Sequence, residues 1–177
     1  MRTITDWGIL LIKHFESLHD GDLSRIGLQP KLCPAGIVTV GWGHVVTMDG
    51  QIFHDLNFCP TELDNLTLEQ AEDLLKQDLK TFCMRVELID EIRNVKNLNP
   101  VFFTDHQFDA LVSFAYNVGI EALKTSTLLK KINANATKEE ITAQFMRWNK
   151  CKGKTLEGLT LRRKAEAILY TENTLIF

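Results

Sequence analysis

Glu16 is the residue of this sequence whose setting is best suited to acid chemistry. It stands directly after Phe15, where a stretch of regularly spaced apolar residues gives way to a loop rich in glycine and proline. A carboxyl group in such a place could protonate the leaving oxygen of a glycosidic bond, which is one requirement for hydrolysing that bond. Taken alone, however, a glutamate at a helix end is more often a solvated surface residue.

The same chemistry also requires a group that places water, or acts as the nucleophile, on the opposite face of the sugar. Two residues able to do so follow in a β-rich segment: Cys33, which carries a thiol, and Thr39, whose hydroxyl could hydrogen-bond a water molecule. Each also has an ordinary structural reading. A cysteine is commonly a small buried hydrophobe, and a threonine is a common strand residue.

The elements that must position these residues begin with a helix near the N-terminus, capped by Thr5 or Asp6. Its buried face is predicted from three- and four-residue spacing to hold Ile4, Trp7, Leu11 and Phe15. A loop is predicted over residues 19–36 and a β-rich run over 37–46, in which Gly41 and Gly43 indicate a bent strand or a close backbone approach. Asp49-Gly50 is typical of a hairpin turn.

Helices are predicted for most of the chain after residue 66. Thr67 and Gln70 form a capping box, and apolar residues then repeat on one face as far as Val86, which predicts a long helix over 67–86. The helical pattern breaks at residues 97–100. Further helices are predicted at about 104–119, 125–133, 137–149 and 160–170, with Thr104 and Thr137 as N-caps.

A series of separated motifs resembles a known family. In chain order they are Phe15-Glu16, Cys33 to His44, Leu111 to Gly119, Ser126 to Leu129, Arg147-Trp148-Asn149, and Gly158-Leu159 leading to Arg162 to Glu166. Together they resemble the bacteriophage-type lysozymes, family 24 of the glycoside hydrolases, and in particular the endolysins. The resemblance covers about residues 5–170, and its specificity comes from the order of the motifs, since no single one would suffice.

The resemblance implies an α+β, lysozyme-like fold in one catalytic domain that spans residues 1–177. A small N-terminal lobe with a β-hairpin sheet is expected at about residues 1–66, a long connecting helix at 67–86, and a larger all-helical lobe at 87–177. Substrate would then lie in a groove between the lobes.

The resemblance also assigns roles to individual residues. The family's catalytic pattern of a glutamate, an aspartate or cysteine, and a threonine carries over to Glu16, Cys33 and Thr39. Tyr116 and Asn117 match its aromatic and amide positions and are expected to contact sugar. The implied reaction is hydrolysis, with inversion, of the β-1,4 bond between N-acetylmuramic acid and N-acetylglucosamine in peptidoglycan.

Two departures from the family pattern keep an alternative open. Many relatives have aspartate where this chain has Cys33, and a thiol is mostly neutral at pH 7, so it cannot replace a carboxylate without activation. Sixteen residues separate Glu16 from Cys33, more than the family pattern has. The additional loop contains Asp20 and Asp22, either of which could serve as the second catalytic group. The spacing of these acids does not complete a calcium loop.

His44 ends the glycine-rich run and invites a catalytic or metal-binding interpretation. No second metal ligand stands at helical or hairpin spacing from it, so no metal and no cofactor are expected. The resemblance implies instead a structural salt bridge between His44 and Asp78, which lies eleven residues after the Thr67 cap.

Basic residues are concentrated in one segment of a chain whose formal net charge is −3. Residues 147–164 hold seven basic side chains and one acid, Glu157. Such a patch is either a solvated surface or a site that attracts an anionic partner such as a polysaccharide. Because no nucleic-acid-binding motif accompanies the charge, no nucleic-acid partner is expected.

Cysteine usage and hydropathy indicate where the protein would be found. None of the four cysteines forms a Cys-x-x-Cys pair, no signal peptide is recognisable, and no apolar run approaches the ~20 residues of a membrane span. We therefore expect a monomer with reduced thiols and no membrane anchor. It would be made in the host cytoplasm, released by a holin, and act in the periplasm or cell wall.

Two functions from different classes fit the sequence. The first is an active endolysin that causes host cell lysis. The second is a catalytically impaired module that only binds peptidoglycan, and the thiol at Cys33 keeps this alternative open.

Overall fold

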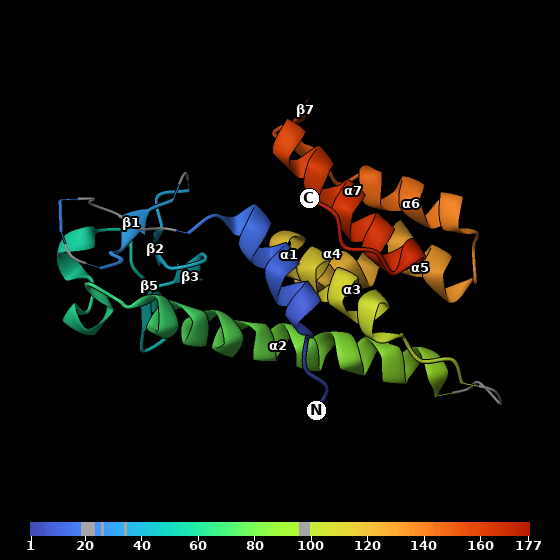
Figure 1. The fold of residues 1–177 in the computed structure, drawn as a ribbon, viewed down its shortest axis with the longest axis horizontal. Coiled ribbons are helices and arrows are strands. Elements are labelled where there is room, and N and C mark those ends of the chain that lie inside the picture. Colours follow the sequence, from blue (N-terminus) through green and yellow to red (C-terminus); the bar gives the residue numbers. More distant parts are fainter. Residues whose placement is uncertain (19–23, 26, 34, 96–99) are drawn as a thin grey trace. The chain divides into compact units, whose positions relative to one another are not determined.

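The structure, a computed structural model, describes residues 1–18, 24–25, 27–33, 35–95 and 100–177, and its fold is α+β and lysozyme-like, as predicted (Figure 1). The helices are α1 (Asp6–Glu16), α2 (Leu68–Asn94), α3 (Asp105–Val118), α4 (Ile120–Thr125), α5 (Thr127–Asn133), α6 (Lys138–Met146) and α7 (Glu157–Glu172). The strands are β1 (Lys31–Leu32), β2 (Val38–Val40), β3 (His44–Val45), β4 (Thr47–Met48), β5 (Gln51–Ile52), β6 (Lys150–Cys151) and β7 (Lys154–Thr155). Short 3-10 helices span Leu56–Phe58 and Thr61–Leu63.

The chain divides into two compact units. Unit 1 consists of residues 1–15 and 79–177, and unit 2 of residues 16–78. This division differs from the expected lobes, which placed all of residues 1–66 with the sheet. Contacts with α3 account for the position of the first helix. The backbone N–H of Thr5 donates to Asp109 (3.0 Å), and a Cβ at Gly8 would lie 2.9 Å from the Cβ of Asp109.

Unit 2 is built on an antiparallel sheet in the order β1-β2-β3. Thr39 pairs with Lys31 on one side and with Val45 on the other. The buried core beneath this sheet contains Val38, Val40, Val46 and Leu66. The separate β4–β5 hairpin turns at Asp49 and Gly50, which have φ angles of 52° and 78°. This confirms the hairpin turn predicted from Asp49-Gly50.

Gly41 and Gly43 belong to a tight turn between β2 and β3 and not to one bent strand. The chain reverses so that Val40 pairs with His44, and both glycines have positive φ angles, 61° and 86°. The close approach expected at this site is present, because a Cβ at Gly41 would lie 3.2 Å from the Cβ of Ala71 on α2. Glycine therefore lets the turn lie against the helix.

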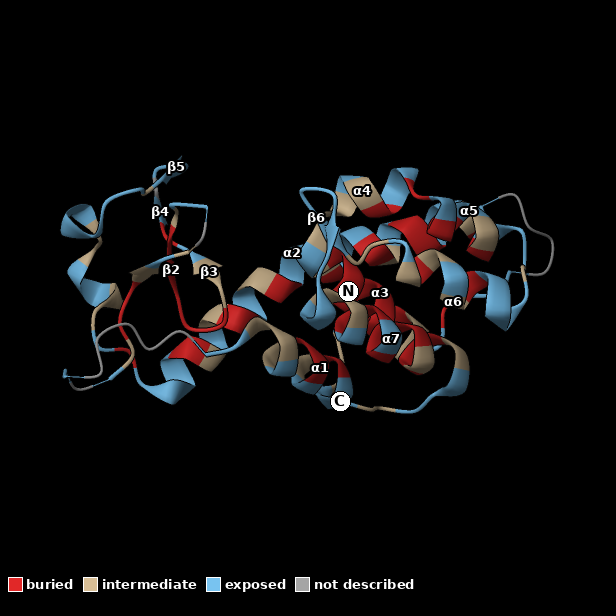
Figure 2. Ribbon diagram, turned by 90° about the horizontal axis from the view of Figure 1, so that it is seen from above, coloured by how far each residue is buried: buried red, intermediate tan, exposed pale blue. Residues whose placement is uncertain are grey.

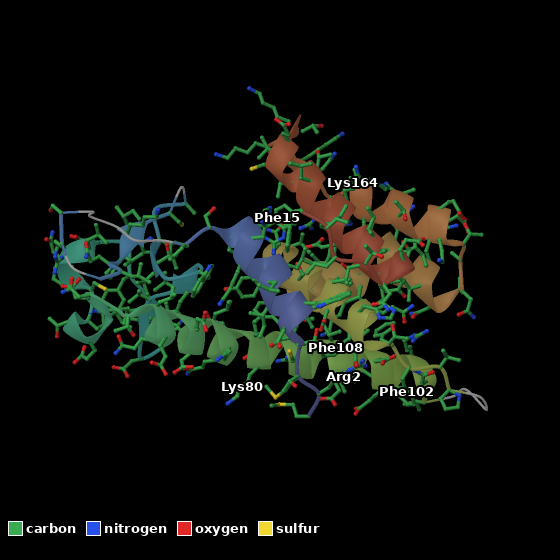
Figure 3. All side chains as sticks on the ribbon, viewed as in Figure 1. Arg2, Phe15, Lys80, Phe102, Phe108 and Lys164 are labelled. Carbon is green, nitrogen blue, oxygen red and sulfur yellow. The ribbon has the colours of Figure 1, made fainter. Side chains whose placement is uncertain are left out.

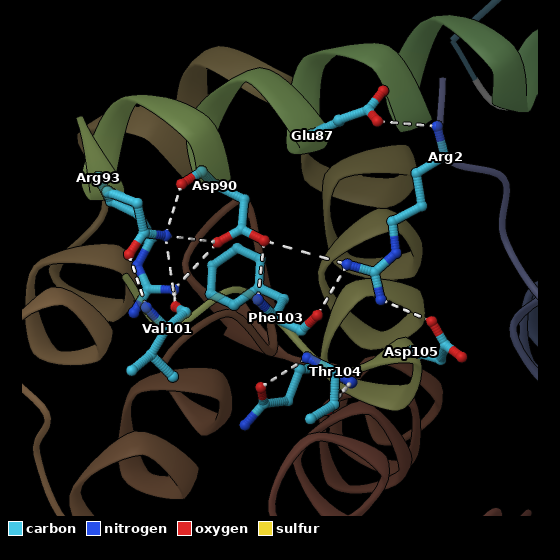
Figure 4. A network of polar contacts seen from close by, with 10 residues as sticks. Arg2, Glu87, Asp90, Arg93, Val101, Phe103, Thr104 and Asp105 are labelled. Atoms are coloured by element: carbon cyan, nitrogen blue, oxygen red, sulfur yellow. Dashed lines mark hydrogen bonds and ion pairs between the residues drawn. The ribbon is translucent and has the colours of Figure 1, made fainter. Parts of the chain in front are cut away.

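The capping box predicted for the long helix is confirmed at the start of α2. Thr67 N–H donates to Gln70 Oε1 (2.8 Å), and Gln70 N–H donates to Thr67 Oγ1 (3.1 Å). The helix continues to Asn94, beyond the predicted end at residue 86. At its C-terminal end Asp90 accepts from Arg93 Nη1 (3.0 Å) and from the backbone N–H of Phe103 (2.7 Å), within the polar network of Figure 4. These polar contacts stabilise the last turns of α2, and they cannot be predicted from the spacing of apolar residues, which was the basis for ending the helix at residue 86.

Unit 1 is organised around α3, which is buried along most of its length (Figure 2). Helix α7 packs against α3 and α6. The predicted N-caps at Thr104 and Thr137 are confirmed, each as a capping box. Among the described residues, no helix combines the length and the apolar composition that crossing a bilayer requires.

Some local predictions need correction, and the choice between Thr5 and Asp6 as the cap of the first helix is resolved. Trp7 is 45% exposed, and the buried face of α1 consists of Gly8, Leu11 and Ile12. Thr5 caps α1, since its Oγ1 accepts from Trp7 N–H (3.2 Å). The helix predicted over 137–149 ends at Met146 and is followed by the unpredicted β6–β7 hairpin, whose turn residues Lys152 and Gly153 both have positive φ. The predicted break at 97–100 lies outside the described residues except for Pro100.

Candidate active site

Glu16 is the last residue of α1, as the sequence predicted, and belongs to unit 2. The helix ends there because Ser17 adopts a left-handed conformation (φ 57°). The Oε2 atom of Glu16 lies 3.7 Å from the position that a Cβ at Gly43 would occupy. The carboxylate is thus placed beside the β2–β3 turn, and a residue without a side chain at position 43 leaves space next to it.

Thr39 and Cys33 lie on one face of the β1–β2 hairpin. Thr39 is directly opposite Lys31, and Cys33 N–H donates to Ile37 O (2.9 Å), which places Cys33 opposite Ile37. Since alternate residues of a strand share a face, Cys33 and Thr39 are diagonal neighbours, a relation that corresponds to roughly 7–8 Å in an antiparallel pair. Thr39 is 4% exposed, and its Oγ1 donates to Lys31 O at 3.4 Å.

Cys33 begins the turn that joins the two strands, because its carbonyl oxygen accepts from Gly36 N–H (2.8 Å). Its side chain is partly exposed, and all four cysteines of the chain are free thiols. The alternative acids Asp20 and Asp22 lie outside the described residues. Unit 2 therefore contains Glu16, Cys33 and Thr39, the three residues that the family resemblance implies as catalytic groups.

His44 lies in β3 and contacts α2. Its Nδ1 is 3.0 Å from both carboxylate oxygens of Asp78, and the two side chains are 21% and 25% exposed. The pair joins β3 to α2. Ala71, on the same helix, lies against Gly41 of the β2–β3 turn. The position of the His44–Asp78 pair is that of a structural contact, consistent with the salt bridge implied by the family resemblance.

Tyr116 and Asn117 lie in the last turn of α3, in unit 1. The ring of Tyr116 packs against Phe82, with centroids 5.2 Å apart and an interplanar angle of 65°. Asn117 is exposed, and its Oδ1 accepts from Arg163 Nη2 at 2.9 Å. Asn117 is therefore an accessible polar side chain with a fixed partner, whereas Tyr116 is partly engaged in packing.

The sequence analysis missed a buried polar cluster on α7. Arg162 and Arg163 are 2% and 0% exposed, although the basic segment had been interpreted as surface or patch. Both pair with Glu166, which is itself 0% exposed, and Glu166 Oε1 also accepts from Ser113 Oγ (2.8 Å). The neighbouring Lys164 points outward (Figure 3). The helical spacing of Glu166 from the two arginines is the signal that could have predicted these pairs.

The chemistry available in unit 2 is acid catalysis and the binding of water. Glu16 supplies a carboxyl beside the β2–β3 turn, and Thr39 and Cys33 supply a hydroxyl and a thiol on one face of the β1–β2 hairpin. Within the described part of the chain, no three histidine, cysteine, aspartate or glutamate side chains are grouped as metal ligands. Unit 1 by itself has an aromatic and an amide side chain, Tyr116 and Asn117, at the end of α3.

A small antiparallel sheet, a long helix and a helical unit, with a glutamate closing the first helix, define a lysozyme-like protein. An endolysin from Escherichia coli O157:H7 phage FAHEc1 has a similar structure, with a TM-score of 0.73, 30% sequence identity, and coverage of 99% of this chain and 98% of that one. A single-residue mutant of P22 lysozyme is also similar, with a TM-score of 0.69, 25% identity, and coverage of 96% and 99%.

Sequence comparison specifies the family. The model described as phage lysozyme matches residues 24–166, and the chain belongs to this family. An endolysin of Acyrthosiphon pisum secondary endosymbiont phage 1 is 35% identical over 94% of this chain and 97% of its own length. The endolysin of Bacillus phage PZA is 34% identical over 97% of this chain but only 56% of its own length. The chain thus spans about half the length of the Bacillus phage relatives that it matches.

Proposed function

We propose that this chain is an endolysin with muramidase activity, which hydrolyses the β-1,4 bond between N-acetylmuramic acid and N-acetylglucosamine in peptidoglycan and so lyses the host cell. Membership of the phage lysozyme family supports the reaction class. The observation that carries the proposal is the position of the Glu16 carboxylate at the end of α1, 3.7 Å from the Cβ position of Gly43.

In this mechanism Glu16 protonates the glycosidic oxygen as the bond to the anomeric carbon breaks. Thr39 and Cys33 hold the water molecule that attacks the anomeric carbon from the opposite face. As its oxygen bonds to that carbon, the water releases one proton to the solvent, from which Glu16 is protonated again. Inversion follows from a single displacement by water. The alternative is a carboxylate nucleophile that forms a covalent glycosyl intermediate, and position 33 carries no carboxylate to provide one.

The proposal is tested by the loss of turbidity of outer-membrane-stripped Gram-negative cells, together with product analysis of purified peptidoglycan. New reducing ends on muramic acid, identified by mass spectrometry after borohydride reduction, are the expected result. The anomeric configuration of the first product, followed by NMR before mutarotation, tests inversion. New reducing ends on N-acetylglucosamine alone, or no cleavage at all, would contradict the proposed reaction.

A second candidate function is a peptidoglycan-binding module with impaired hydrolysis. The observation that favours it is the thiol of Cys33 in the position where many relatives have an aspartate. The two functions differ in one measurement. A binding module would sediment with insoluble peptidoglycan and release no soluble fragments, whereas the enzyme would bind and also release fragments.

We further propose a monomer that is made in the host cytoplasm and reaches the cell wall with the help of a holin. Four free thiols suit a reducing compartment. To test the dependence on a holin, the chain is expressed without one, and the cells should stay intact until the membrane is permeabilised. To test the monomer, light scattering of the purified protein should give the mass of one chain. Lysis during expression alone would contradict the dependence on a holin.

A further inference from the structure

Asn117 is exposed, but its carboxamide has one orientation because of the residue behind it. Arg163 Nη2 lies 2.9 Å from Asn117 Oδ1. A guanidinium group has only N–H donors, so the amide oxygen must face it and the amide NH₂ must face away. The amide N–H donors are therefore directed to the exposed side of the residue, where a ligand can reach them.

We propose that Arg163 is a positioning residue, which fixes the Asn117 carboxamide with its two N–H donors outward. The sugar bound at Asn117 must then offer an acceptor oxygen, such as a hydroxyl or the carbonyl of an N-acetyl group. This inference rests on the proposed function, because it takes Asn117 to be a contact of the glycan substrate.

The guanidinium group is itself held in place from several sides. The Nε atom of Arg163 lies 3.0 Å from Glu166 Oε2, and its Nη2 donates to Glu166 Oε1 (3.2 Å) as well as to Asn117. The Cζ atom of the guanidinium lies 4.9 Å from the ring centroid of Phe114. Both Arg163 and Glu166 are 0% exposed. A side chain locked by packing and by charge-assisted hydrogen bonds can hold the next residue in a single geometry.

A reversed carboxamide would place N–H donors against the guanidinium and lose the charge-assisted bond to Oδ1. The buried cluster therefore selects one orientation of an exposed amide before substrate arrives, and the selected orientation donates outward. Preorganisation of this kind improves binding because the side chain is already ordered. Removal of the positioning residue should consequently weaken substrate binding more than it slows the chemical step.

Arg162 provides a matched control on the same helix. It is also almost completely buried and pairs with the same carboxylate, through Nε and Glu166 Oε1 (3.1 Å), but its Nη2 donates to Ser113 O (3.2 Å), whereas Nη2 of Arg163 donates to Asn117. Arg163→Lys and Arg162→Lys should therefore disturb the core to a similar extent. Only the first change should alter the orientation of the amide.

The experiment measures KM and kcat on purified glycan strands for Asn117→Ala, Arg163→Lys, Arg162→Lys and the double variant Asn117→Ala/Arg163→Lys. We expect Arg163→Lys to raise KM about tenfold with kcat changed less than about threefold, the signature of lost ground-state binding. Arg162→Lys should leave KM unchanged. The double variant should have the KM of Asn117→Ala alone. Equal KM changes in the two lysine variants, or additive losses in the double variant, would overturn the proposal.

Asn117→Asp tests the inference without a change in the core. An aspartate can still accept from Arg163 but offers no outward donor, so its KM should rise as in Asn117→Ala. A wild-type KM in this variant would overturn the inference even if Arg163→Lys did not fold. Wild-type activity separates the two levels of proposal: an inactive wild-type chain contradicts the muramidase function, whereas an active one that is insensitive at Asn117 and Arg163 contradicts the positioning role alone.

Discussion

Glu16 is distinguished from the other carboxylates of unit 2 by its setting. It is partly buried, it ends a helix, and its nearest turn has a glycine where any other residue would place a Cβ 3.7 Å from the carboxylate. Glu69, by comparison, is an exposed residue in the first turn of α2. The two glutamates therefore form a matched pair for testing whether position or general acidity matters.

Glu16→Gln should abolish most of the muramidase activity, because glutamine keeps the shape of the side chain but cannot give a proton. Loss of a general acid usually lowers the rate by about 10²–10⁴. Glu69→Gln should retain wild-type activity. The measurement is the rate of turbidity loss, with circular dichroism melts to show that both variants fold. More than about a tenth of wild-type activity in folded Glu16→Gln, a smaller loss than that range, would contradict the assignment.

Cys33 should contribute through the placement of water and not through a disulfide. We expect Cys33→Ala to lower activity at least about tenfold, and Cys33→Asp to retain part of it because a carboxylate can also bind and activate water. Cys151→Ala is the control, since this thiol is exposed in the β6–β7 hairpin. Full activity of Cys33→Ala would transfer the role to Asp20 or Asp22, and a bridged Cys33 in non-reducing mass analysis would also contradict the idea.

The sequence nominated the site residues of unit 2 because each stands in a recognisable local pattern. Glu16 ends an amphipathic repeat, and Cys33 and Thr39 stand in a motif of the family. The role of Arg163 could not be predicted in the same way. Its burial depends on the packing of α7 against α3, and its contact with Asn117 joins residues 46 positions apart. A basic run in a sequence indicates surface unless tertiary contacts are known.

At the scale of elements, the β2–β3 turn depends on its contact with α2. Gly41 allows the turn to approach Ala71, and the His44–Asp78 pair joins the following strand to the same helix. These two contacts hold the sheet that carries Thr39 against the helix. Capping boxes and the Asp49-Gly50 turn were predictable because their hydrogen bonds are local, within four residues. The exposure of Trp7 was not, because periodicity defines a helix face but not the exact direction of its burial.

The His44–Asp78 pair should stabilise unit 2, which a double-mutant cycle with His44→Asn and Asp78→Asn can measure. We expect a coupling energy of about 1 kcal/mol, between the values for exposed and for buried pairs, because both side chains are about three-quarters buried. The control cycle uses Arg25 and Asp64, a more exposed pair of the same unit at 3.2 Å, with an expected coupling below about 0.5 kcal/mol. Additive losses in the first cycle would show that the contact contributes nothing.

For the molecule as a whole, the chain's formal charge of −3 conceals an uneven distribution. Five of the basic residues in 147–164 are exposed, namely Arg147, Lys150, Lys152, Lys154 and Lys164. The other two are buried with Glu166, so the exposed patch is smaller than the sequence indicated. Unit 1 therefore buries the ionisable side chains of Arg162, Arg163 and Glu166, and it buries another on α3, the carboxyl group of Asp109.

Asp109 is a carboxyl group buried in the middle of α3, with 1% exposure. It accepts hydrogen bonds from the backbone N–H and the hydroxyl of Thr5, the residue that caps α1. Burial raises the pKa of Asp109 above its ordinary value, and the hydrogen bonds from Thr5 only partly oppose this. The folded state therefore favours the protonated carboxyl more than the unfolded state does.

The stability of the protein should accordingly depend on pH through Asp109. Because the pKa is raised on folding, this contribution is fully present below the unfolded value of about 3.9 and is lost as pH rises through the raised folded value. Asp109→Asn keeps an acceptor for the Thr5 N–H and never ionises. We therefore expect it to gain stability relative to wild type between pH 4 and pH 7, by about 1.4 kcal/mol for each unit of the shift. Urea unfolding at both pH values measures the change, with the exposed Asp73→Asn as control. A difference between Asp109→Asn and wild type that is the same at both pH values would show that burial of this carboxyl has no such effect.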